Sequence, residues 1–213
     1  RALNVGLSDV FSTDPRVSVL DVDYLASCHG IRQLVDPKLR YLAGIEVGER
    51  FMPALARAQV GYLKAVKGLS RKCVVLDLDG TLWGGTVGED GPDGIQLGEG
   101  ALGRAYQDFQ RYLLALSQCG VLLAINSKNN PADALEVIVQ HPSMILREAQ
   151  FASIQINWND KPENMLRLAE ELNLGVESLI FVDDNPAERL QMRHQLPQVL
   201  TVDLPDDPCR YLE

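Results

Sequence analysis

The chain has 213 residues, of which 46% are hydrophobic, so it can bury one good core and carry a smaller appendage. Its net charge of -9 disfavours nucleic acid and anionic membranes as partners. No apolar run approaches the ~20 residues that a membrane-spanning helix needs, and no secretory signal is visible.

The four cysteines lie far apart and form no Cys-x-x-Cys pair, which disfavours a zinc site and a disulfide framework. Reduced thiols predict a cytoplasmic protein. The chain begins with Arg1 rather than Met, and we expect it to be part of a longer protein.

Residues 1–70 carry no chemical motif and are expected to form an N-terminal appendage or the tail of an upstream domain. We expect a strand at 17–22, a short helix at 23–29 and a longer helix at 53–67. The longer helix has a proline in its first turn and apolar residues along one face.

From residue 71 the pattern becomes strand, loop and helix, repeated, which predicts an α/β domain over 71–213 with a mainly parallel sheet flanked by helices. The expected strands are residues 73–76, 121–126, 144–146, 179–182 and 198–202. The expected helices are residues 101–118 and three that open at Asn130-Pro131, Pro162 and Asn185-Pro186.

The stretch 84–100 contains seven glycines and is too short to build a core of its own. We expect it to form a small flap or hairpin rather than a large cap domain.

Asp77 and Asp79 follow the first apolar run without a break. Such a pair lies at the carboxyl edge of a sheet, where open α/β folds place their ligands. The two carboxylates repel each other unless a cation or a shared proton lies between them. A surface pair that serves only solubility is the alternative, and the preceding buried run disfavours it.

Three later strand ends or helix starts carry Ser127, Lys161 and the pair Asp183-Asp184. In a parallel sheet these groups converge on one edge. Each has an ordinary alternative: a turn cap, a solvated charge, or acids that merely precede a helix. The occurrence of all these residues in this order favours a catalytic site over the separate alternatives.

The predicted chemistry is phosphoryl transfer, which needs a nucleophile, a proton shuttle and groups that neutralise the phosphate. Asp77 can form an aspartyl-phosphate. Asp79 can protonate the leaving oxygen and later activate water. Ser127 can donate a hydrogen bond to the phosphoryl group, and Lys161 can neutralise its charge.

An all-oxygen site of this kind suits Mg²⁺. The predicted ligands are the Asp77 carboxylate, Asp79 through its backbone carbonyl, and a carboxylate from Asp183 or Asp184.

This order of motifs resembles the haloacid dehalogenase (HAD) superfamily of phosphotransferases. Asp77-x-Asp79-x-Thr81 matches its first motif, and the second, third and fourth are Ser127, Lys161 and Asp183-Asp184. The stretches around these motifs are similar to those of the FkbH-like family of polyketide pathways, over roughly residues 71–211. They read LDLDGTLWGG, SKNN, NW and FVDDNPAER.

The resemblance implies a Rossmann-like HAD fold and a glyceryl transferase/phosphatase. Proteins of the FkbH-like family take 1,3-bisphosphoglycerate, move glyceryl to a thiol, remove the remaining phosphate and deliver glyceryl to an acyl carrier protein. The family has Cys immediately before the Ser of the second motif, and this chain has Asn126 there.

An amide cannot form the thioester, so the transfer step stays open, although Asn126 could hydrogen-bond a substrate. Cys73 lies four residues before Asp77, toward the wrong end of the sheet, and is expected to be a buried structural thiol.

Thr81, Trp83, Gly84 and Gly85 are predicted to contact substrate. Trp83 has two readings of equal weight: core packing beneath the flap, or closure over the substrate to exclude water.

Lys128 is also assigned to substrate binding. With Arg147, Arg189 and Arg193 it could form a basic rim for phosphopantetheine or an acidic carrier protein, although a solvated surface is the simpler reading for each. Two other functions stay open: a stand-alone HAD phosphatase, and a carrier-protein binding module without turnover.

Overall fold

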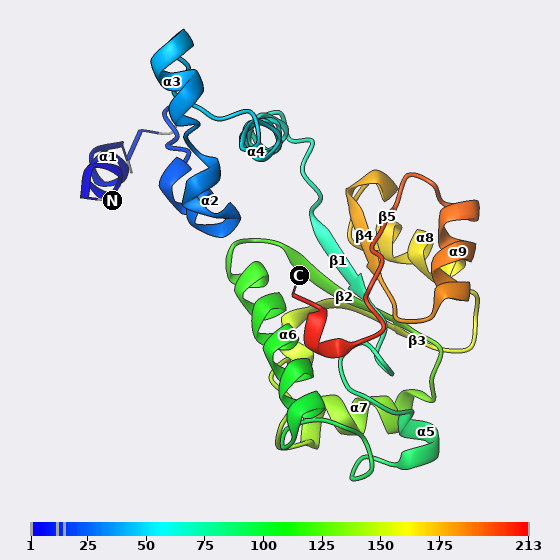
Figure 1. Cartoon of the computed structure of the whole chain (residues 1–213). Helices are drawn as coiled ribbons and strands as arrows, with labels where there is room; N and C mark the ends of the chain where they lie inside the picture. Colours follow the sequence, from blue (N-terminus) through cyan, green and yellow to red (C-terminus); the bar gives the residue numbers. More distant parts are fainter. Residues whose placement is uncertain (1, 12, 15, 213) are drawn as a thin grey trace. The chain divides into compact units, whose positions relative to one another are not determined.

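The structure is a computed structural model that describes residues 2–11, 13–14 and 16–212 (Figure 1). The chain divides into two compact units, residues 1–70 and 71–213. Among the described residues, no helix combines the length and the apolarity that crossing a bilayer requires.

The first unit is helical and has a small core of three buried residues, Ala26, Phe51 and Ala54. Its α-helices are α1 (Ala2–Phe11), α2 (Val22–His29), α3 (Pro37–Ala43) and α4 (Met52–Val66). The helix predicted at 53–67 is confirmed as α4. The strand predicted at 17–22 is wrong, because the Asp21 side chain accepts the Tyr24 N–H and caps α2.

The second unit is built on a parallel five-stranded sheet in the order β3-β2-β1-β4-β5. The strands are β1 (Cys73–Leu76), β2 (Leu122–Ser127), β3 (Phe151–Ile156), β4 (Leu179–Val182) and β5 (Leu200–Thr201). The predicted parallel sheet is confirmed. The first strand of the unit lies at its centre, so the chain crosses to the other side of β1 between β3 and β4.

Helices cover both faces of this sheet (Figure 1). The helices are α5 (Val87–Asp90), α6 (Ala101–Gln118), α7 (Pro131–Gln140), α8 (Lys161–Glu171) and α9 (Pro186–Gln195). Strand residues point alternately to the two faces. Val74 and Leu76 join the core cluster beneath α6 and α7, whereas Cys73 and Val75 join the cluster beneath α8 and α9.

The third strand was predicted at 144–146 and lies at Phe151–Ile156 instead. Residues Met144 and Leu146 are buried, as their apolar character indicated, but they lie in a loop. The side chain of Gln110 on α6 accepts the N–H groups of Ile145 and Leu146. Gln110 therefore supplies the hydrogen-bond acceptor that a neighbouring strand would otherwise offer to these N–H groups.

The helix predicted at 101–118 is confirmed as α6. The helix α9 begins as predicted, with the Asn185 side chain accepting the Ala187 N–H. Glu188, in the first turn of α9, pairs with Lys128.

The segment between β1 and α6 is not a full hairpin. Its described bridges are isolated: Gly84 pairs with Gln96 in antiparallel fashion, and Asp79 pairs with Trp83 in parallel fashion. The helix α5 forms a single turn. Ile95 and Leu97 are buried in the core cluster beneath α6 and α7. The segment therefore packs down onto the domain.

Candidate active site

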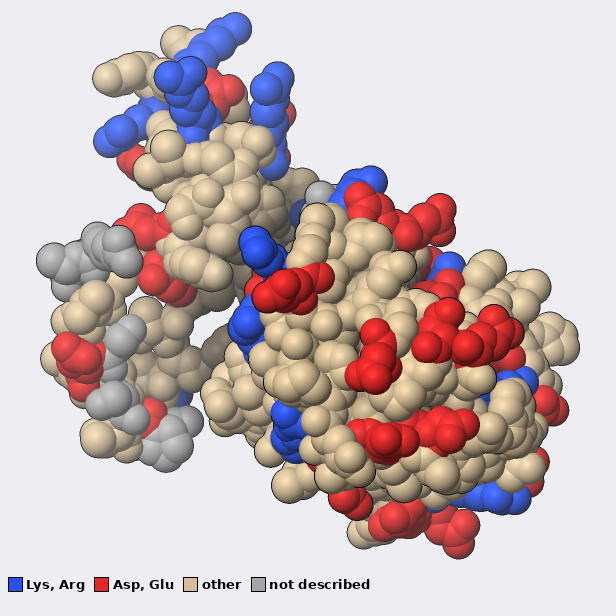
Figure 2. Space-filling model, turned by 90° about the horizontal axis from the view of Figure 1, so that it is seen from below, with Lys and Arg blue, Asp and Glu red and all other residues tan. Residues whose placement is uncertain are grey.

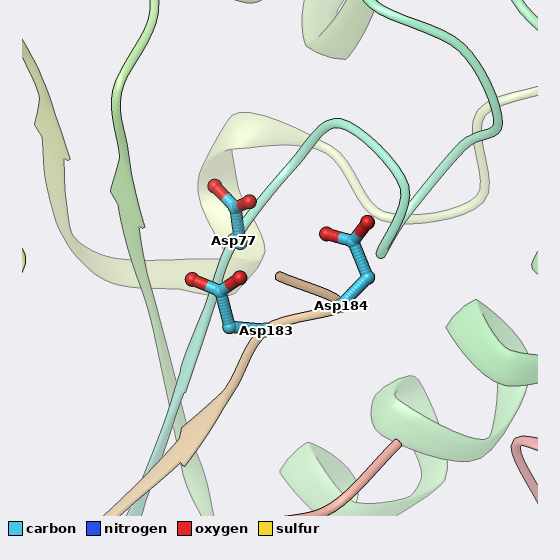
Figure 3. Close-up of side chains that lie close together, drawn as sticks. All are labelled: Asp77, Asp183 and Asp184. Atoms are coloured by element: carbon cyan, nitrogen blue, oxygen red, sulfur yellow. The ribbon is translucent and has the colours of Figure 1, made fainter. Parts of the chain in front are cut away.

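Three carboxylates meet where β1 and β4 end (Figure 3). Asp77 directly follows β1, and Asp183 and Asp184 directly follow β4. The strands are paired in register, with Leu76 beside Val182, so their ends lie next to each other. One oxygen from each carboxylate lies within 4.8 Å of the other two. This is the crossing point of the sheet, where open α/β folds bind ligands.

Lys161 is buried among these acids at the first position of α8. Its Nζ lies 2.9 Å from Asp77 Oδ1 and 2.5 Å from Asp183 Oδ2. Buried charges are tolerated only when they are paired. The three carboxylates carry three negative charges and Lys161 carries one positive charge, so the cluster retains two negative charges.

This donor set fits a divalent cation that prefers oxygen ligands, such as Mg²⁺. Asp77, Asp183 and Asp184 each offer a carboxylate oxygen. The residual charge of the cluster equals and opposes that of one such ion. Residues with these positions and this chemistry can therefore hold a metal.

The excess of negative charge in the cluster, together with burial, shifts the pKa values of Asp183, Asp184 and Lys161. Burial and repulsion from Asp77 raise the pKa of Asp183 to about 6, although Lys161 partly offsets them. Burial and repulsion from Asp77 also raise the pKa of Asp184. Burial alone would lower the pKa of Lys161, but the attraction of Asp77 and Asp183 outweighs it and raises that pKa. A bound cation would relieve the repulsion among the carboxylates.

The Asp79 carboxylate is not part of this cluster, although it lines the same cavity as Asp77 and Asp184. Its Oδ1 accepts the Trp83 indole N–H at 2.7 Å and the Val87 N–H at 3.1 Å, and its Oδ2 accepts Asn129 Nδ2 at 2.8 Å. Burial is the main cause that raises the pKa of Asp79. A metal contact from this residue would have to use its backbone carbonyl, as the sequence suggested.

Trp83 lies in the core and has no exposed surface. Of its two predicted roles, the structure favours packing beneath the flap over closure on a substrate. The indole N–H bond to Asp79 nevertheless links this core residue to the site.

Thr81 and Gly80 lie against Asp184. Thr81 Oγ1 accepts the Asp184 N–H at 3.2 Å. Gly80 has φ +72, and a Cβ built there would lie 2.2 Å from Asp184 Oδ2. Tyr211 donates its hydroxyl to the Gly80 carbonyl at 2.7 Å. The space that a side chain at position 80 would need is thus filled by the Asp184 carboxylate.

A cavity of about 340 Å³ opens over the carboxylates. Its lining residues are Asp77, Asp79, Gly80, Gly85, Thr86, Asp184 and Asn185. Gly85, predicted for substrate binding, lines this cavity. Gly84 is not among the lining residues and pairs its backbone with Gln96.

Asn126 and Ser127 end β2, next to β1, and both are buried. Adjacent strand residues point to opposite faces of a sheet. The Asn126 amide donates to the Lys161 carbonyl at 2.8 Å and accepts Asn164 Nδ2 at 3.2 Å. Its polar ends are therefore bound to α8, and the predicted hydrogen bond from Asn126 to a substrate is not favoured.

Lys128 and the other predicted rim cations are held within the chain. Lys128 Nζ lies 2.8 Å from Glu188 and 3.6 Å from Asp160. The three arginines bind backbone carbonyls, and two of them also pair with one aspartate; they are Arg147, Arg189 and Arg193. These contacts do not favour a free basic rim. Figure 2 shows instead many acidic side chains on the face of the larger unit in view.

Asn129 and Asn164 contact the predicted residues but were not predicted. Asn129 binds Asp79, and Asn164 binds Asn126 and Asn157. In the sequence, Asn129 lies in the polar stretch SKNN, which begins at the last residue of β2 and forms part of the family resemblance.

No family model matches the chain, and no curated protein matches it. Among solved structures, it is similar to the N-terminal part of the protein BF1531 from Bacteroides fragilis, which contains a phosphatase domain and was solved in complex with Mg. The TM-score is 0.91 at 32% identity, and the match covers 99% of this chain and 56% of that one. This chain shares that fold. The prediction of an α/β fold with a mainly parallel sheet flanked by helices is confirmed.

Two further likenesses are weaker. A HAD family enzyme from Bacteroides thetaiotaomicron, in complex with magnesium and inorganic phosphate, gives a TM-score of 0.45 at 14% identity and covers 64% of this chain and 96% of that one. A haloacid dehalogenase-like hydrolase from Xanthomonas campestris gives a TM-score of 0.41 at 14% identity. That match covers 65% of this chain and 84% of that one.

Proposed function

We propose that this chain is a Mg²⁺-dependent phosphatase of the HAD superfamily that works through an aspartyl-phosphate on Asp77. The observation that carries the proposal is the meeting of Asp77, Lys161, Asp183 and Asp184 at the end of the central strand, with Asp79 on the same cavity. The similarity to a phosphatase domain solved with Mg supports it.

The residues divide the reaction between them. An oxygen of Asp77 attacks phosphorus, an Asp77–phosphorus bond forms, and the bond to the leaving oxygen breaks while Asp79 supplies its proton. Asp79 then takes a proton from a water molecule, which attacks phosphorus and restores Asp77. When bound, Mg²⁺ supplies positive charge to the phosphoryl oxygens.

Lys161 and Ser127 are proposed to assist in different ways. Lys161 already contacts Asp77 and Asp183, so it holds the nucleophile in place and adds positive charge. Ser127, at the end of β2, is proposed to donate a hydrogen bond to the phosphoryl group, as in the second motif of the family. Lys128 and Thr81 remain proposed contributors at the edge of the site.

From the FkbH-like motifs we further propose that the substrate is a phosphoglyceryl unit derived from 1,3-bisphosphoglycerate and destined for an acyl carrier protein in polyketide biosynthesis. The phosphatase step is the part that the site supports. The transfer step lacks its thiol, because Asn126 replaces the expected Cys. Cys73 is fully buried, and burial raises its pKa to about 12, which disfavours a thiolate.

The test is phosphate release from a panel of phosphate esters, with and without Mg²⁺. Asp77→Asn and excess EDTA should each abolish release. The control Asp108→Asn changes an exposed acid on α6 that pairs with Arg111, and it should release phosphate normally. Normal turnover in EDTA would exclude the metal, and normal turnover of Asp77→Asn would exclude the nucleophile. A chain that binds a carrier protein but releases no phosphate would be a binding module.

A further inference from the structure

Asp79 is held from three directions. Two donors, the Trp83 indole and the Val87 backbone, lie on Oδ1 at 2.7 and 3.1 Å. The third, Asn129 Nδ2, lies on Oδ2 at 2.8 Å. These donors come from the segment after β1 and from the loop after β2, so two separate parts of the domain fix one carboxyl group.

The donors also determine which oxygen can carry a proton. A carboxylate offers about four acceptor sites, and three of them are filled. An indole N–H and a backbone N–H only donate, so Oδ1 has no room for a proton unless one bond breaks. The Asn129 amide is fixed in the donating sense, because its own Oδ1 accepts the Asn130 N–H at 3.0 Å. The free acceptor site is on Oδ2.

We call Trp83, Val87 and Asn129, the three residues that donate to Asp79, the clamp. Trp83, Val87 and Asn129 are 0%, 2% and 3% exposed. The Gln110 side chain further anchors this segment, because its Nε2 donates to the Leu82 carbonyl at 2.8 Å. The three hydrogen bonds to buried donors therefore orient the carboxyl group.

We infer that Trp83 and Asn129 are positioning residues that direct the proton of Asp79, on Oδ2, to the leaving oxygen of the substrate. The inference rests on the proposed phosphatase function. As Asp77 bonds to phosphorus, the electron pair of the breaking bond moves to the leaving oxygen, and the Oδ2 proton moves with it. The leaving group departs as a neutral alcohol, and Asp79 is left as a carboxylate.

This arrangement points to a substrate class. A proton is needed when the leaving group is an alkoxide, because an alkoxide is a strong base. It is not needed for a nitrophenolate or a carboxylate, which leave as stable anions. A site with an acid fixed in this way is suited to phosphate monoesters of aliphatic alcohols.

The test compares two substrates, glycerol phosphate and p-nitrophenyl phosphate, in saturating Mg²⁺. The variants are Trp83→Phe, which keeps an apolar ring but removes the N–H, and Asn129→Ala. The matched controls are Trp158→Phe and Asn159→Ala, two exposed residues of the same types. The readout is kcat/KM, because it reports the first phosphoryl transfer and not the later hydrolysis step. Thermal unfolding checks that each variant is folded.

General acid catalysis contributes on the order of 10²- to 10⁴-fold. We expect each clamp variant to lose about tenfold or more in kcat/KM on glycerol phosphate and less than about threefold on p-nitrophenyl phosphate. Asp79→Asn should show the same selectivity with a larger loss. The controls should match the native protein on both substrates.

Two results would contradict the positioning role of Trp83 and Asn129 without contradicting the proposed phosphatase function. One is an equal loss on both substrates, which indicates general damage to the site. The other is full activity of both variants on glycerol phosphate. A native protein that releases phosphate from neither substrate would instead contradict the proposed function, and the inference with it.

Discussion

Replacing Asn126 by Cys introduces the residue that FkbH-like proteins have before the Ser of the second motif. If the missing thiol were the only deficit, the variant would accept glyceryl from 1,3-bisphosphoglycerate. The structure predicts a different result, because the Asn126 side chain is fully buried and its amide is bonded to α8.

The magnitude follows from the two hydrogen bonds that the substitution removes. The Lys161 carbonyl loses the donor at 2.8 Å, and Asn164 Nδ2 loses one acceptor at 3.2 Å, although it keeps Asn157 at 2.9 Å. An unsatisfied buried polar group costs about 1–3 kcal/mol. Since one group loses its side-chain partner and the other keeps one, we expect Asn126→Cys to lower the free energy of unfolding by about 1–4 kcal/mol.

The effect should reach the site through Lys161, whose backbone is the group that Asn126 holds. We therefore expect a lower rate of phosphate release in addition to lower stability. Urea unfolding measures the stability, and intact-protein mass spectrometry after incubation with 1,3-bisphosphoglycerate detects any glyceryl adduct. Asn159→Ala, on the exposed turn before α8, is the matched control.

A stable glyceryl adduct on Asn126→Cys would refute this reasoning, because it would mean that substrate reaches position 126. Unchanged stability would refute the role assigned to the amide. The native protein should form no such adduct in the same experiment.

Two further predictions concern the acids at the end of β4. Because Asp183 has a pKa of about 6 in the folded chain against an ordinary value of 3.8, its contribution to stability is present below about pH 4 and lost as pH rises through about 6. In EDTA, the Tm of the native protein should therefore fall relative to that of Asp183→Asn between pH 4.5 and 7; parallel curves would contradict this. A left-handed backbone conformation costs a non-glycine residue about 1–2 kcal/mol. Gly80→Ala should lower the free energy of unfolding by more than this, because the added Cβ would also meet the Asp184 side chain. Urea unfolding should show a smaller loss for Gly120→Ala, which has φ +93 and open space, and equal losses would count against the contact.

The fold was predictable because it depends on patterns that repeat along the chain. Short apolar runs followed by amphipathic segments indicated the parallel sheet, and the prolines and asparagines that open α7 and α9 indicated where those helices begin. The third strand was misplaced because the loop at 144–146 is as buried as a strand. Hydrophobicity reports burial, and it does not report whether a backbone pairs with another strand or with Gln110.

The site was predictable only where topology brings residues together. The carboxyl-edge rule placed Asp77 and Asp183 on one edge before any distance was known. It could not predict that Asn129 binds Asp79, because that contact depends on the path of a loop. It also could not predict which face Asn126 would occupy, since a one-residue change of register reverses the orientation of every side chain in a strand.

The central position of β1 also affects how the protein is made. Asp77 is synthesised well before Asp183 and Asp184, and Val75 pairs with Phe181 across most of the unit. Contacts this distant in sequence close late and slow the folding of a domain. While the ribosome is still adding β4, the nascent chain has Asp77, the proposed nucleophile, but neither the Asp183–Asp184 pair nor the contacts that β4 makes with β1. The proposed activity should therefore appear only after β4 has been synthesised and the sheet is complete.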